Sequence, residues 1–218
     1  MKKNRKLRLL SLLVCVLLLF GSTAMADSIF SVWFGKKENL TGVHYVEIEV
    51  ENYGVITAEL YADIAPITVT NFVKLCNEKF YDGLTFHRII SGFMIQGGDP
   101  LGNGMGGSPD KIKGEFAANG VKNDLKHERG VLSMARSQQM DSASSQFFIM
   151  HQDAPHLDGQ YAAFGKVIEG MEVVDAICQK TPVADWNGTV IPANQPVITC
   201  IRVIEAPEAT TIPETEAQ

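Results

Sequence analysis

The chain has 218 residues, of which 45% are hydrophobic, and this length suits one domain with its own core. The formal net charge of −6 becomes −11 if the first 26 residues are removed, because they carry five basic and no acidic residues. So acidic a chain is a poor binder of nucleic acids or of anionic membranes.

The N-terminus predicts a signal peptide over residues 1–26. Five Lys and Arg residues precede an apolar run from Leu9 to Phe20, and Ala24-Met25-Ala26 supplies a small-x-small cleavage site. The run is short for a membrane span, which takes about 20 residues. We expect export with cleavage after Ala26. The alternatives are an uncleaved membrane anchor and a lipoprotein processed at Cys15, which Val14 disfavours.

The next predicted elements are a hairpin and a helix. Residues 27–42 form a mixed lead-in, and one domain is expected over residues 43–205. Val46, Ile48 and Val50 alternate with glutamates, which is typical of a half-buried strand, and a turn at 52–54 leads into a second strand over 55–61. A helix follows from Pro66, with Thr68 or Thr70 as its cap.

Further along the chain, strand patterns alternate with turn-rich stretches. A second helix is predicted over 169–179, long loops over 97–120 and 180–195, and a disordered acidic tail over 206–218. The remaining strands are expected over residues 86–90, 93–96, 130–135, 146–150, 162–168 and 196–204. The pattern predicts a mainly β fold, a closed eight-stranded antiparallel barrel capped by two α-helices, with an open α+β sheet as the alternative.

Three cysteines remain after residue 26, namely Cys76, Cys178 and Cys200. Since an odd number cannot pair completely within one chain, buried thiols are the favoured interpretation. If one disulfide forms, Cys178 and Cys200 are the expected partners.

Familiar hydrolytic, metal-binding and phosphate-binding motifs are missing from the sequence. There is no Gly-x-Ser-x-Gly elbow, and the glycines after residue 96 lack a following Gly-Lys-Ser/Thr. His151, Asp153, His156 and Asp158 lie close in sequence, but without a Cys pair or His-Glu-x-x-His they do not predict a metal site. A hydrolase or metal protein built on them is the least favoured alternative.

The stretch from Phe86 to Asp99 carries more information, because it places Arg88 among large apolar residues. A guanidinium is costly to bury, so Arg88 is either a member of an ion pair or the polar element of a lined pocket. On extended strands Arg88 and Gln96 can converge near apolar groups of Phe93, Met94 and Phe148. The pattern alone leaves both possibilities open.

Several segments together resemble the signature sequences of the cyclophilins. They are Phe86-His87-Arg88 through Gly97-Gly98-Asp99, residues 130–135, Ser145-Gln146-Phe147-Phe148-Ile149, Leu157-Asp158-Gly159 and residues 164–167, and the similarity covers about residues 43–204. The resemblance implies an eight-stranded barrel with two helices, peptidyl-prolyl cis–trans isomerase activity on proline-containing polypeptides, no cofactor and no metal. We also expect a monomer. A non-catalytic chaperone or scaffold module that binds proline segments is the alternative.

The resemblance also implies roles for individual residues. Arg88 would be the catalytic arginine and Gln96 its polar companion, and Ala135, Arg136 and Gln146 would lie along the groove for the substrate backbone. The proline pocket would be lined by Phe93, Met94, Phe148 and Leu157. Two positions depart from the family: His156 stands where cyclophilins often have Trp, and Tyr161 where they often have His. The first change predicts weak cyclosporin binding.

Overall fold

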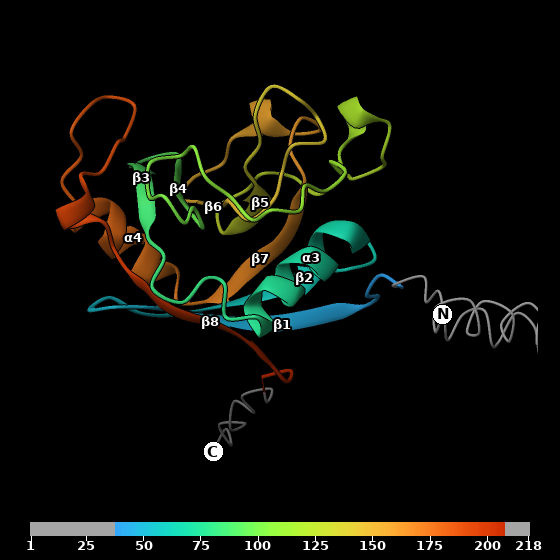
Figure 1. The fold of residues 1–218 in the computed structure, drawn as a ribbon, viewed down its shortest axis with the longest axis horizontal. Coiled ribbons are helices and arrows are strands. Elements are labelled where there is room, and N and C mark those ends of the chain that lie inside the picture. The colour runs from blue at the N-terminus through green and yellow to red at the C-terminus, as the bar shows by residue number, and fades with distance from the viewer. Residues whose placement is uncertain (1–37, 208–218) are drawn as a thin grey trace, which may run out of the picture. The chain divides into compact units, whose positions relative to one another are not determined.

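The computed structural model describes residues 38–207. Their strands form one eight-stranded antiparallel sheet in the order β3-β4-β6-β5-β7-β2-β1-β8, with two α-helices (Figure 1). The strands are β1 Val43–Val50, β2 Gly54–Tyr61, β3 Phe86–Ile90, β4 Met94–Gly97, β5 Val131–Met134, β6 Phe147–Met150, β7 Ala163–Glu169 and β8 Ile198–Ile204. The helices are α3 Pro66–Asn77 and α4 Met171–Lys180, with short 3₁₀ turns at Ala117–Asn119, Pro155–Leu157 and Pro192–Asn194. The predicted elements are present, with ends that differ by a residue or two.

The alternating pattern of β1 builds the core as expected. Val46, Ile48 and Val50 are buried, whereas Glu47 and Glu49 between them are exposed. The sheet curls, and α3 and α4 lie toward opposite ends of it (Figure 1). Both helices bury their apolar side chains in the same main cluster as the inner face of the sheet. The mainly β architecture with two helices is therefore confirmed.

The prediction of a closed barrel goes somewhat too far. The two outermost strands, β3 and β8, do not pair with each other; the isolated bridge between Thr85 and Val197 joins the segments that precede them. The outer edge of β3 is occupied instead by the loop after α4, because Ile89 N–H donates to the Gly188 carbonyl and Val190 N–H to the His87 carbonyl. A strand edge that is already paired cannot take a second partner along its length.

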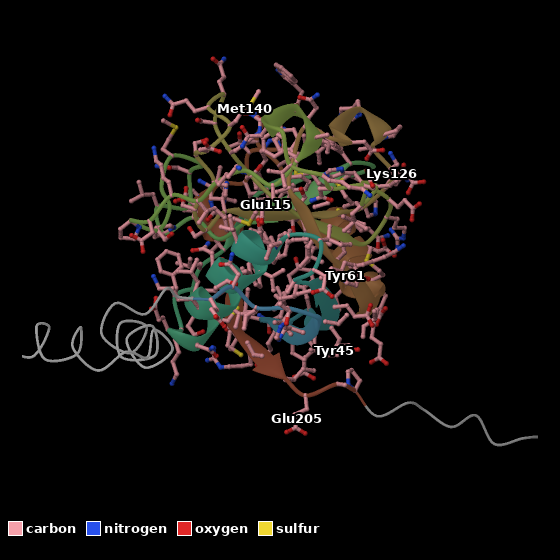
Figure 2. The ribbon with its side chains drawn as sticks, turned by 90° about the vertical axis from the view of Figure 1, so that its right-hand side faces the viewer. Tyr45, Tyr61, Glu115, Lys126, Met140 and Glu205 are labelled. Atoms are coloured by element: carbon pink, nitrogen blue, oxygen red, sulfur yellow. The ribbon has the colours of Figure 1, made fainter. Side chains whose placement is uncertain are left out.

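The predicted caps of α3, Thr68 or Thr70, are wrong. The N-cap residue is Ala65, and it makes no side-chain hydrogen bond to the first turn. The carboxylate of Glu115, 47 residues after Thr68, accepts hydrogen bonds from Ile67 N–H at 3.0 Å, Thr68 N–H at 2.8 Å and the Thr68 hydroxyl at 2.7 Å. Figure 2 labels Glu115 beside this helix. The free N–H groups of the first turn, which normally need a nearby cap, are satisfied by a buried carboxylate that the fold brings to them.

The predicted signal peptide, residues 27–37 of the lead-in and almost all of the predicted tail lie outside the described residues. The end of the lead-in contacts the domain: Leu40 N–H donates to the Thr70 hydroxyl and Gly42 N–H to the Asp63 carboxylate, both at 2.8 Å. Within residues 38–207, no helix has the length and apolar character to cross a membrane.

Cys76, Cys178 and Cys200 are all free thiols, so Cys178 and Cys200 do not pair.

Candidate functional site

The register of the strands builds the site on the face of the sheet opposite the main core. Arg88 on β3 pairs with Gln96 on β4, and Gln96 pairs with Phe148 on β6, so the three side chains form one row across the strands. The next row pairs Ile90 with Met94. Met94 and Phe148 of these rows belong to a second apolar cluster, which also contains Val131, Met150, Ala154, Leu157 and Ala163.

A pocket of about 270 Å³ opens above this cluster. It brings together nine of the residues that the sequence singled out, namely Arg88, Phe93, Met94, Gln96, Ala135, Arg136, Phe148, Leu157 and Tyr161. Gln146 lines a neighbouring hollow of about 380 Å³, which shares Gln96, Ala135 and Arg136 with the first. His156 is outside both lining sets. A pocket that combines apolar side chains with a few convergent polar groups is typical of a site that binds a small group with fixed orientation.

Arg88 is the polar element of this pocket and not a member of an ion pair. Its Nε donates to the Asn187 carbonyl at 2.9 Å, and its two terminal nitrogens donate to Asn187 Oδ1 at 3.3 Å and Gln96 Oε1 at 3.4 Å. None of the ion pairs formed among residues 38–207 includes it. The alternative left open by the sequence is thereby decided, because every hydrogen-bond partner of the guanidinium is neutral.

Partial burial lowers the pKa of Arg88, while the more distant Tyr161 and Asp185 act in the opposite direction. The ordinary pKa of arginine is above about 12, so the group keeps its charge at neutral pH. The site therefore holds a fixed cation, uncompensated by direct contact, at the edge of a pocket with apolar walls. Such a cation acts on a ligand more strongly than the same group in bulk water.

A chain of amides links Arg88 to the glycine-rich loop after β4. Gln96 Nε2 donates to Gln146 Oε1 at 2.9 Å, and Gln146 Nε2 donates to the carbonyls of Gly104 at 3.1 Å and Gly106 at 2.7 Å. These contacts leave Gln96 Oε1 facing Arg88. The side-chain orientation of Gln96 is thus fixed by its partners on both sides.

The loop itself is organised by Asp99, whose carboxylate accepts N–H groups of Leu101, Asn103 and Gly104. Burial alone would raise the pKa of Asp99, but these backbone donors outweigh it and hold the pKa below its ordinary value. The ionised carboxylate is therefore the form that keeps the wall of the second hollow in place.

Phe148, at the floor of the pocket, rests on a buried histidine. The rings of His127 and Phe148 stack with centroids 6.1 Å apart, while His127 contacts Asp158 Oδ1 at 3.2 Å and Ser133 Oγ at 3.0 Å. Burial lowers the pKa of His127, against the opposing effect of Asp158. A histidine held on both ring nitrogens is a rigid support for the aromatic ring that it carries.

Aromatic contacts complete the rim of the pocket. His156 stacks on Phe93 with centroids 5.7 Å apart, so it reaches the rim through Phe93. The Arg136 guanidinium lies 4.7 Å from the Tyr161 ring centroid, and Tyr161 packs edge-on against Phe148. The two positions that depart from the family pattern thus both contact pocket residues.

The residues of the His151–Asp158 segment serve different parts of the fold. His151 Nδ1 accepts the Gly92 N–H at 2.8 Å and its Nε2 contacts Asp175 at 3.1 Å, whereas Asp158 binds His127. Among the described residues no group of three such side chains is placed to hold a metal ion.

Two supports of the site, Asn187 and His127, were not predicted from the sequence. The Asn187-Gly188 pair is a turn signal, but its contact with Arg88 joins positions 99 residues apart. His127 lies in a stretch without periodicity. The role of Asn187 becomes visible from the pairing of its loop with the edge of β3, and that of His127 from its stacking on Phe148.

Comparison with known proteins agrees with this geometry. The family model for "Cyclophilin type peptidyl-prolyl cis-trans isomerase/CLD" matches residues 45–203. A peptidyl-prolyl cis-trans isomerase of Helicobacter pylori (strain J99) is 47% identical over 146 residues, 66% of this chain and 86% of that protein. The peptidyl-prolyl cis-trans isomerase B of Bacillus subtilis is 51% identical over 123 residues, 56% of this chain and 82% of that protein.

Solved structures show the same fold. The crystal structure of a cyclophilin type isomerase from Cryptosporidium parvum superposes with a TM-score of 0.67 at 33% identity, covering 76% of this chain and all (100%) of that one. A second structure of that protein, in the presence of the dipeptide Ala-Pro, gives a TM-score of 0.65 at 34% identity over 74% of this chain and 99% of that one. The chain belongs to the cyclophilin type of peptidyl-prolyl cis-trans isomerases.

Proposed function

We propose that this isomerase accelerates rotation about Xaa-Pro bonds in exported or unfolded polypeptides, and that rotation takes place in the Arg88 pocket. The observation that carries the proposal is the guanidinium of Arg88, held by neutral partners at the edge of a hollow of about 270 Å³ that is lined by both apolar and polar side chains. The relative studied in the presence of Ala-Pro supports a substrate of this class.

The reaction needs no nucleophile and no general base. An Xaa-Pro bond is kept planar by amide resonance, with a barrier of about 18–20 kcal/mol, and its two isomers differ by about 0.5–1 kcal/mol. Both planar states are therefore populated, and no covalent bond is broken in passing between them. The enzyme has to bind the twisted state better than either planar one.

Arg88 is suited to stabilising the twisted state. Twisting the bond ends the conjugation and localises a lone pair on the proline nitrogen, which then attracts a nearby cation. A guanidinium offers five fixed N–H donors, so Arg88 can hold the proline carbonyl and approach the nitrogen together. Each tenfold of rate requires about 1.4 kcal/mol, which is within reach of one charged hydrogen bond in a desolvated site.

The remaining pocket residues would hold the substrate while the bond turns. The apolar walls would clamp the proline ring, and the polar groove beside them would bind the backbone on either side. The walls are Phe93, Met94, Phe148 and Leu157, and the groove comprises Ala135, Arg136 and Gln146. With the ring fixed, the residue before proline is the part that rotates.

We also propose that the protein binds cyclosporin weakly and that it is a monomer. In the family, cyclosporin affinity depends on an indole at the position of His156. The imidazole of His156 stacks on Phe93 but offers a smaller apolar face than an indole. Titration with cyclosporin is expected to show much weaker inhibition than in family members that carry Trp there.

Turnover distinguishes the isomerase from a module that only binds proline segments. We expect NMR exchange spectroscopy on an Ala-Ala-Pro-Phe peptide to show cis–trans exchange accelerated by catalytic amounts of the protein. A module that binds without catalysis would shift peptide resonances and leave the exchange rate at its uncatalysed value. That second result would contradict the proposal.

Export is supported by the basic start, the apolar run and the Ala24-Met25-Ala26 site. Fractionation of the cells that make the protein, followed by N-terminal sequencing of the purified product, tests this part. We expect a chain that begins at Asp27 outside the cytoplasm. A cytoplasmic chain that retains residues 1–26 would contradict it.

A further inference from the structure

A third hollow, of about 180 Å³, lies at the C-terminal end of β3. It is formed by three segments: the end of β3, the C-terminal turn of α4 and the loop that follows α4. Ile90, Cys178, Thr181, Val183 and Trp186 are among its lining residues. We refer to it below as the Trp186 groove.

The apolar lining of this groove is unusually exposed. The side chain of Trp186 is 94% exposed, the highest value among the large hydrophobic residues that the structure describes, and Val183 is 47% exposed. An indole offers one of the largest apolar surfaces of any side chain, and it gains free energy when a partner covers it. Contiguous exposed apolar residues mark interaction surfaces more often than isolated ones do.

The loop that carries Trp186 is held in place by its own hydrogen bonds. Ala184 N–H donates to the Thr189 carbonyl at 2.7 Å, Gly188 N–H to the Asp185 carbonyl at 3.1 Å, and Thr189 N–H to Asp185 Oδ1 at 3.0 Å. Gly188 has φ +81°, and a Cβ there would collide with the Ile89 carbonyl. Because this turn is pinned against β3, covering Trp186 costs little ordering of the loop.

The Trp186 groove lies next to residues that build the proline pocket. Ile90 lines the groove and also packs on the apolar cluster beneath the pocket. Trp186 directly precedes Asn187, the residue whose carbonyl and side chain hold Arg88. An extended chain advances about 3.3 Å per residue, so residues that flank a proline bound at Arg88 are the part of a polypeptide that would meet this groove.

The chemistry of the lining favours an uncharged occupant. Asp185 is the one charged residue in the lining, and its Oδ1 is engaged by the Thr189 N–H. The other lining groups are apolar side chains, a thiol, hydroxyls and a glycine backbone. An aromatic or large aliphatic side chain would bury the indole and bring no charge of its own into the groove.

We propose that the Trp186 groove is a second subsite for the same client polypeptide, which accepts a large apolar side chain, best an aromatic one, a few residues from the proline. The inference rests on the proposed function, since it assigns the groove to the segment that the Arg88 pocket binds. It makes this enzyme selective for proline segments with a nearby apolar residue, which unfolded chains expose more fully than folded ones do.

A peptide scan tests the subsite. The parent peptide has one proline among alanines, and Phe, Leu or Lys is placed singly two, three or four residues before or after the proline. Catalysed cis–trans exchange is measured by NMR for each peptide. We expect Phe at one position to raise kcat/KM about three- to tenfold, mainly through KM, with Leu next and Lys without gain.

The variant Trp186→Ala should reduce the ratio of kcat/KM between the best Phe peptide and the parent to about one. The matched control is Ile168→Ala, which removes another exposed apolar side chain, on β7, and should retain the full ratio. In a Trp33→Phe background Trp186 is the remaining tryptophan, so its fluorescence should shift to the blue when the Phe peptide binds.

Several results would overturn the inference while leaving the proposed function intact: equal turnover of all peptides, a preference for Lys, or an unchanged ratio in Trp186→Ala. Self-association of the wild-type protein that Trp186→Ala abolishes, measured by sedimentation without peptide, would assign the groove to a second copy instead. Failure of the wild-type protein to turn over any proline peptide would contradict the proposed function itself.

Discussion

Arg88 and Asn187, which stand 99 positions apart in the chain, are joined by two hydrogen bonds. The contact exists because the loop after α4 pairs with the outer edge of β3, through the bridge between Arg88 and Thr189. The same pairing explains why β8 does not close the sheet against β3. The part of the fold that leaves the barrel incomplete is thus the part that orients its arginine.

Replacing Asn187 with Ala should reduce kcat about threefold to tenfold and change KM little. The Asn187 carbonyl would still accept from Arg88 Nε, but the contact of Oδ1 with the terminal nitrogen would be lost, and a hydrogen bond to a charged group contributes about 1–2 kcal/mol. Exchange spectroscopy over a range of peptide concentrations separates the two parameters. Asn187→Gln keeps a neutral amide acceptor at this position and should recover part of kcat; equal loss in both variants would show that the side chain acts only through the fold.

Gln96→Ala should reduce kcat/KM about tenfold, because the variant frees one side of Arg88 and leaves Gln146 without its amide partner. Gln146→Ala should have a smaller effect of the same kind. If the two residues act as one chain, the double variant loses less than the product of the single losses. Independent, multiplicative losses of kcat/KM in the protease-coupled assay would show that Gln96 and Gln146 do not act as one chain.

Glu115→Ala should destabilise the fold by about 2–4 kcal/mol without changing the chemistry of the site. Glu115 is 2% exposed, and its removal leaves two N–H groups and the Thr68 hydroxyl without their acceptor. Urea unfolding measures the loss, and kcat/KM of the remaining folded protein should be that of the wild type. The exposed Glu169→Ala, at the end of β7, is the control and should cost under about 0.5 kcal/mol. An equal, small effect of both changes would contradict the capping role.

Acid should destabilise the protein through its buried histidines. Burial lowers the pKa of His87, with Asp99 opposing and Arg88 reinforcing the shift, and neither ring nitrogen has a hydrogen-bond partner among the described residues. On acidification the unfolded state therefore takes up a proton on His87 at a higher pH than the folded state does. The contribution of neutral His87 to the free energy of unfolding is fully present above the unfolded pKa of about 6.5 and is lost as the pH falls below it.

Urea unfolding between pH 7.5 and pH 5 checks this prediction. His87→Met should show a smaller loss of stability over that range than the wild type, and the exposed His156→Gln should show the same loss as the wild type. Parallel curves for His87→Met and the wild type would mean that His87 does not contribute to the acid sensitivity.

The period-two alternation of β1, from Val46 to Val50, predicted strands correctly because one face of each hydrogen-bonded strand must be buried. The face shared by Arg88 and Gln96 was predicted for the same reason. Such local patterns are predictive because the burial of one strand face produces them directly. Local patterns therefore indicated the strands and the convergence of Arg88 and Gln96, whereas Ala135, Arg136, Leu157 and Tyr161 were assigned to the site through the resemblance to the cyclophilins.

The misplaced cap of α3 and the missed Asn187 have a different origin. Glu115 and Asn187 act on residues 47 and 99 positions away, and no local pattern encodes such a distance. The extent of barrel closure depended likewise on which segment takes the edge of β3. These features are decided by tertiary pairing, which the spacing of apolar residues does not specify.

The central claim, that the fixed charge of Arg88 drives the rotation, is tested most directly by kcat/KM of Arg88→Ala on a proline peptide, measured with the protease-coupled assay on protein shown by circular dichroism to be folded. We expect a loss of about 100-fold or more, since the group that stabilises the twisted bond is gone. Arg88→Lys should recover only part of it, because an ammonium lacks the planar fork. Turnover of Arg88→Ala near that of the wild type would contradict the account.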